Sequence, residues 1–64
     1  MNAAKMINYR VSKGYNRENS VAKLEKVMAI SMADDVRICT LLYWGFISQY
    51  TANKQMQSLV KVGA

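Results

Sequence analysis

A single cysteine and the absence of histidine limit how so short a chain can be stabilised. A chain of 64 residues hides only about 60% of its unfolded surface when it folds, so its hydrophobic core is marginal. Cys39 has no partner for an internal disulfide, and a structural zinc site needs four Cys or His ligands. We therefore expect one small domain over residues 1–64 that is stabilised as a homodimer, with no metal site and no cofactor.

Positive charge is concentrated near the start of the chain. Residues 1–17 contain four Lys or Arg residues and no Asp or Glu, within a chain of net charge +5. Such a basic end suits contact with phosphate groups or another anionic surface, and a solvated tail is the alternative. The most apolar stretch, 36–50, includes Arg37 and Gln49 and is shorter than the roughly 20 residues that span a bilayer. We expect a cytoplasmic protein with no membrane partner.

The segment before the first glycine alternates apolar and polar side chains. Ile7, Tyr9 and Val11 are each separated by one polar residue. A period of two is typical of a half-buried strand, and these residue types favour strands. A helix is the competing interpretation, because the segment is short. We predict a strand within a basic arm at 1–12, then a turn at 13–16 in which Gly14 takes a positive φ.

Helical spacing dominates the rest of the chain. A helix over 17–30 would have Asn16 as its N-cap, and a helix over 32–50 would be capped by Ser31. The second helix is apolar on nearly every side, so it must be buried nearly all round, which places it at the centre of a dimer. A short helix over 52–62 would follow, capped by Thr51. The shared core is predicted to contain Val21, Leu24, Met28, Val36, Cys39, Tyr43 and Ile47.

Groups that could carry out catalysis are scarce. Asp34 and Asp35 are adjacent, so on a helix they point roughly 100° apart and cannot share a proton or a metal ion. Cys39 has no His or Lys nearby in the sequence, which indicates a buried, inert thiol. There is no glycine-rich phosphate loop. We expect no enzymatic activity, no catalytic residue and no small-molecule substrate.

A strand followed by helices, in a basic chain expected to dimerise, resembles the ribbon-helix-helix repressors. The strand of that family carries an apolar–Asn–apolar–Arg–apolar pattern, which stands here as Ile7-Asn8-Tyr9-Arg10-Val11. The resemblance implies an intertwined dimer that inserts an antiparallel β-ribbon into the major groove of double-stranded DNA, as a transcriptional repressor. By this resemblance the base-reading residues are Asn8, Arg10 and Ser12. The implied phosphate contacts are Lys5, Lys13, Arg17 and Ser31.

An all-α domain of three or four helices is the alternative. In that case residues 1–11 are helical, and the apolar helix within 36–50 supplies both a self-interface and a surface for another protein. The function would be that of a small phage- or plasmid-type interaction module that modulates a host protein. The backbone conformation of residues 5–12 distinguishes the two interpretations.

Overall fold

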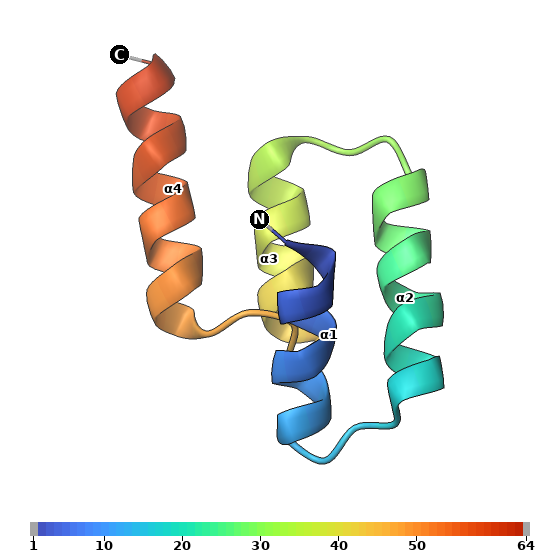
Figure 1. Ribbon diagram of the computed structural model, residues 1–64. Coiled ribbons are helices and arrows are strands. Elements are labelled where there is room, and N and C mark those ends of the chain that lie inside the picture. The colour runs from blue at the N-terminus through green and yellow to red at the C-terminus, as the bar shows by residue number, and fades with distance from the viewer. Residues whose placement is uncertain (1, 64) are drawn as a thin grey trace.

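The computed structural model describes residues 2–63, and the side chains of residues 2–60 (Figure 1). Its elements are the helices α1 (Ala3–Ser12), α2 (Arg17–Ala29), α3 (Asp34–Tyr43) and α4 (Gln49–Gly63). α1 packs against α2 and α3 packs against α4, and the two hairpins meet through α2 and α3. Residues 2–63 contain no strand, so the predicted N-terminal strand and β-ribbon are wrong, and the all-α alternative is confirmed.

The first segment is helical because it has both an N-cap and a buried helical face. Asn2 Oδ1 accepts a hydrogen bond from the backbone N–H of Ala4 at 2.8 Å, which is a capping contact. Met6 and Arg10 lie four residues apart, on the same side of a helix, and both are buried. The three apolar residues of the predicted strand are each only partly buried.

The second helix agrees with the helix expected at 17–30. Asn16 is its N-cap, and its Oδ1 accepts a hydrogen bond from the backbone N–H of Asn19 at 2.9 Å. Leu24 and Val27 are buried on its inner side. The turn before it contains Gly14 with a φ of 101°, as predicted.

The apolar helix predicted over 32–50 is divided in two. Gly45 has a φ of 84°, in the left-handed region that terminates helices. Its N–H donates to the carbonyl oxygen of Leu42 at 3.2 Å, and the N–H of Phe46 donates to that of Leu41 at 2.9 Å. These two bonds form a Schellman motif, which ends α3 at Tyr43 and turns the chain toward α4.

The start of α4 also differs from the expectation. Ser48 Oγ accepts a hydrogen bond from the backbone N–H of Thr51 at 3.2 Å, and the Ser48 hydroxyl donates to Thr51 Oγ1 at 3.1 Å. Ser48 therefore makes the capping contact that was predicted for Thr51. Because α3 ends early, Tyr50 lies in α4 and not at the end of a long α3.

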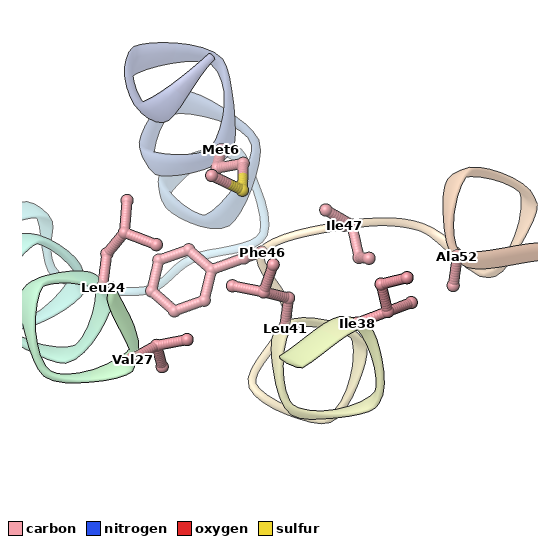
Figure 2. Close-up of a cluster of buried hydrophobic side chains, with 8 residues drawn as sticks. All are labelled: Met6, Leu24, Val27, Ile38, Leu41, Phe46, Ile47 and Ala52. Atoms are coloured by element: carbon pink, nitrogen blue, oxygen red, sulfur yellow. The ribbon is translucent and has the colours of Figure 1, made fainter. Parts of the chain in front are cut away.

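The hydrophobic core lies where the two hairpins meet. Phe46, in the turn between α3 and α4, is 1% exposed, and its ring lies between Leu24 and Leu41 (Figure 2). The buried apolar residues are Met6, Leu24, Val27, Ile38, Leu41, Phe46, Ile47 and Ala52. Of the predicted core, only Leu24 and Ile47 belong to this cluster, because the inner side of α3 carries Ile38 and Leu41.

The bundle is flat. Its extents are 39 × 24 × 17 Å, and its radius of gyration of 11.9 Å exceeds the value of about 10.7 Å typical of a compact domain of this length. Within the described chain, no Cα atom of α1 lies within 8 Å of a Cα atom of α4. α1 and α4 are therefore not closely packed against each other.

Candidate protein-interaction surface

Arg10, which the resemblance made a base-reading residue, belongs to the core. Its side chain is 3% exposed. Nε donates to the carbonyl oxygen of Trp44 at 2.7 Å, and Nη1 donates to Ser20 Oγ at 2.8 Å. The guanidinium carbon lies 4.1 Å from the centre of the Tyr15 ring and 5.0 Å from that of Phe46. Arg10 thus joins α1 and α2 to the turn after α3, and it is not available to contact DNA bases.

The other predicted contact residues on α1 remain accessible. Asn8 and Ser12 are exposed, and with Lys5 they occupy one side of the helix. Asn8 Oδ1 accepts a hydrogen bond from Arg17 Nη1 at 3.0 Å, and Ser12 Oγ donates to a carbonyl of its own helix at 2.6 Å. Lys13, also exposed, follows directly after α1. Five of the seven predicted DNA contacts are therefore exposed on or near α1.

Ser31 lies apart from this group. It is exposed in the connection between α2 and α3, at the other end of α2 from Arg17 (Figure 1). It was also predicted to cap the following helix, but the N-cap of α3 is Ala33, which makes no side-chain capping hydrogen bond. The predicted cap is therefore wrong.

An apolar stripe that was predicted to be buried lies on the outer side of α3. Tyr43 is 85% exposed, Val36 is 50% exposed, and Cys39 is exposed as well. Their spacing of three and four residues places them on one side of the helix, away from the buried Ile38 and Leu41. The prediction of a buried thiol is therefore wrong for this chain.

A shallow groove of about 500 Å³ runs along this stripe. We call it the outer groove; the stripe, Asp35, Trp44 and Met56 are among the residues that line it. Asp35 is the one charged side chain among the described residues that line the groove. Contiguous exposed apolar surface of this kind marks sites of protein association more often than ordinary solvent-exposed surface.

The outward direction of Tyr43 and the contribution of Met56 were missed in the sequence. Both sides of residues 34–43 carry apolar side chains at helical spacing, so spacing alone could not identify the inner side. The available signal was Gly45, because a helix that ends there brings Phe46 and Ile47 into the core. The side with Val36 and Tyr43 is then left without a cover.

Comparisons with known proteins gave no matching family, no curated relative and no similar solved structure. Among the residues that the structure describes, no group of three or more Cys, Asp or Glu side chains could hold a metal ion. In that same part of the chain, no helix combines the length and apolarity needed to cross a bilayer. The function is therefore inferred from the chemistry of the protein's own surfaces.

Proposed function

We propose that the protein is a small helical interaction module that works as a homodimer, with the outer groove as its contact surface. The observation that carries this proposal is the exposed stripe of Val36, Cys39 and Tyr43, beside a core of eight buried apolar residues among the side chains of residues 2–60. A small core is marginal by itself, and covering large exposed apolar side chains stabilises a folded chain.

The distribution of charge favours a second copy of the chain as the occupant of the outer groove. The net charge is +5, so two copies repel each other over most of their surfaces. The outer groove has no Lys or Arg among its described lining residues, and Lys23 approaches it only from beside Trp44, where its Nζ lies 4.7 Å from the centre of the ring. A single helix side with residues at spacings of three and four also packs well on an identical helix about a twofold axis.

The two copies of α3 pair in an antiparallel arrangement. A parallel pair would bring the two Asp35 carboxylates together and would oppose the two large Tyr43 side chains. An antiparallel pair separates the carboxylates and packs Tyr43 against the smaller Val36 of the other copy. Pairing large with small side chains fills an interface most evenly.

Sedimentation equilibrium of three purified chains tests this function. Tyr43→Glu puts a charge against Val36 of the other copy and should weaken dimerisation by at least about 30-fold. Tyr50→Glu is the matched control, because Tyr50 is 67% exposed on α4 and does not line the outer groove. We expect a dimer for the unchanged chain and for Tyr50→Glu. A monomer at millimolar concentration, or equal effects of the two substitutions, would contradict the proposal.

As a second candidate, we propose that each copy binds duplex DNA with the exposed side of α1. Lys5, Lys13 and Arg17 are exposed, and residues 1–17 contain no carboxylate side chain. Arg17 donates to Asn8 of α1 at 3.0 Å, and Lys13 Nζ lies 4.9 Å from the centre of the Tyr9 ring of the same helix. None of the described lining residues of the outer groove comes from α1, so the dimer leaves this side free. Neither a β-ribbon nor Arg10 takes part in this form of binding.

The salt dependence of DNA affinity tests the second candidate. Contacts from three cations predict a slope of about −3 for log affinity against log salt in each copy. Lys5→Ala should lower that slope by about one unit, whereas Lys54→Ala, an exposed substitution on α4, should leave it unchanged. Affinity that is independent of salt, or equal slopes for the two variants, would remove this candidate.

A further inference from the structure

The outer groove has side chains of opposite charge near its two ends. Asp35, which lines the groove, lies in the first turn of α3, and Trp44 follows the last residue of that helix. Lys23 reaches the Trp44 end from α2, which packs beside α3 (Figure 1), and its Nζ lies 4.7 Å from the centre of the Trp44 ring. The backbone rises by about 13 Å along α3 between Asp35 and Trp44, so a negative charge marks one end of the groove and a positive charge the other.

An antiparallel contact aligns each of these ends with the opposite end of the other copy. The dimer proposed above packs Tyr43 against Val36 of the other copy, which puts the twofold axis midway between these two positions. The next residue outward on each side is Trp44 or Asp35, so the same axis brings Asp35 level with Trp44 of the other copy. Lys23 of that copy lies beside this Trp44 ring. A parallel pair would instead bring like charges together at each end.

Both side chains are accessible enough to meet across this contact. Asp35 is exposed, and its Oδ1 accepts a hydrogen bond from the backbone N–H of Val36 at 2.9 Å, which holds the carboxylate at the start of α3. A carboxylate has about four acceptor positions, so it can also accept from an ammonium group. Lys23 is partly exposed, and its flexible four-carbon stem lets Nζ turn from the Trp44 ring to a carboxylate beside that ring.

We propose that Asp35 of each copy pairs with Lys23 of the other copy, and that these two ion pairs set the antiparallel orientation of the dimer. This inference rests on the proposed homodimer and adds the residues that determine its orientation. Each copy has a net charge of +5, so the contact forms against a general repulsion. Two pairs of opposite charge oppose that repulsion only when the copies are antiparallel. Complementary charges across an interface fix its orientation more than they raise its affinity.

Charge reversal at either position tests the pairing, because two reversed chains should complement each other. Asp35→Lys and Lys23→Glu each place two like-charged pairs in their own homodimer, so each should dimerise at least about tenfold more weakly than the unchanged chain. A heterodimer of the two variants has two attractive pairs again. Sedimentation of a trace of fluorescent Lys23→Glu with an excess of Asp35→Lys should therefore give an affinity within about threefold of that of the unchanged homodimer. Failure of the two variants to complement each other would overturn the proposal.

Glu25→Lys is the matched control for net charge. It adds the same charge as Asp35→Lys, and Glu25 is exposed, does not line the outer groove and lies on nearly the opposite side of α2 from Lys23. Its heterodimer with Lys23→Glu contains one attractive and one repulsive pair. Fluorescent Lys23→Glu should therefore bind Asp35→Lys at least about threefold more tightly than it binds Glu25→Lys. Equal binding to these two chains would show that only net charge matters, and would contradict the ion pair.

Neutral substitutions give a second test that does not depend on reversed charges. Asp35→Asn keeps an oxygen that can accept from the N–H of Val36, and Lys23→Gln keeps a long polar side chain. Each should weaken the homodimer about fivefold, and the double variant also about fivefold, since either change breaks both pairs. A double variant weakened by the product, about 25-fold, would contradict the pairing. If Tyr43→Glu still dissociates that dimer selectively, the ion pair is wrong and the homodimer stands.

Discussion

Arg10 brings a positive charge into the core and pairs it with neutral groups. Its hydrogen bonds reach the carbonyl oxygen of Trp44 and the hydroxyl of Ser20, and its guanidinium faces the rings of Tyr15 and Phe46. Removal of a cation from water is costly in free energy. The stability of this arrangement therefore depends on how well the hydrogen bonds and rings around Arg10 replace its contacts with water. The planar guanidinium can stack on rings and donate in two directions, whereas an ammonium group is more strongly hydrated.

We predict that Arg10→Lys destabilises the fold more than Arg10→Met does. Lysine keeps the buried charge and loses the two-directional geometry, so the free energy of unfolding should fall by about 2–3 kcal/mol. Methionine loses the hydrogen bonds but also removes the charge, so the loss should be about 1 kcal/mol. Urea denaturation measures both, with exposed Lys26→Met expected to change stability by less than about 0.5 kcal/mol. A milder effect of lysine than of methionine would contradict this account of the site.

The role of Arg10 could not be derived from its residue type or from the charge pattern. Asn8 and Arg10 are two residues apart, so they share one side of a strand but lie on nearly opposite sides of a helix. A strand would have placed Arg10 on the exposed side together with Asn8. In the helix Arg10 points into the core, whereas Asn8 stays exposed. The local signal that favoured the helix was Asn2, which caps α1.

The helices differ in which side chains accept hydrogen bonds from the backbone N–H groups of the first turn. Asn16 caps α2 with a side-chain hydrogen bond, whereas Ala33 at the start of α3 makes none. Asp34 and Asp35 in the first turn of α3 interact favourably with the helix dipole, and Asp35 Oδ1 accepts a hydrogen bond from the backbone N–H of Val36 at 2.9 Å. A side chain within the first turn of α3 therefore binds one of its N–H groups, and the N-cap residue contributes no side-chain bond.

Two substitutions at helix N-caps should have opposite effects on stability. Ala33→Ser adds a hydroxyl that can accept from the backbone N–H of Asp35, because Asp35 Oδ1 already binds that of Val36, so it should stabilise the fold by about 1 kcal/mol. Asn16→Ala removes the existing bond and should destabilise it by about 1 kcal/mol. Thermal unfolding followed by circular dichroism reports both changes. Loss of stability in Ala33→Ser would show that the start of α3 is satisfied in another way.

The elements that were predicted well are those with one apolar side and a clear cap. The helix at 17–30 has both, and it appears as α2. The segment 32–50 has apolar residues on every side, and burial of the whole segment was the simplest expectation. The Schellman motif at Gly45 divides the segment into two short helices. Phe46 and Ile47, in the turn between them, are buried, and the stripe on α3 is exposed. The competition between two apolar sides is decided by tertiary packing and not by helical spacing.

At the scale of the molecule, two helical hairpins share one small core and leave a shallow groove on the outer side of α3. The outer groove is nearly free of charge, and the exposed side of α1 is basic. The homodimer expected from chain length stays a prediction, and the outer groove is the surface proposed for its contact. The three predicted core residues on α3, Val36, Cys39 and Tyr43, line the outer groove and do not belong to the core.

Isotope-filtered NOE measurement on a mixture of labelled and unlabelled chains tests the antiparallel α3 contact most directly. We predict intermolecular NOEs between the ring protons of Tyr43 in one copy and the methyl groups of Val36 in the other. Further intermolecular NOEs should involve Cys39 and Met56. NOEs that connect only Tyr43 with Tyr43 would contradict the antiparallel arrangement. A complete absence of intermolecular NOEs from α3, at concentrations where the chain is fully associated, would contradict the interface itself.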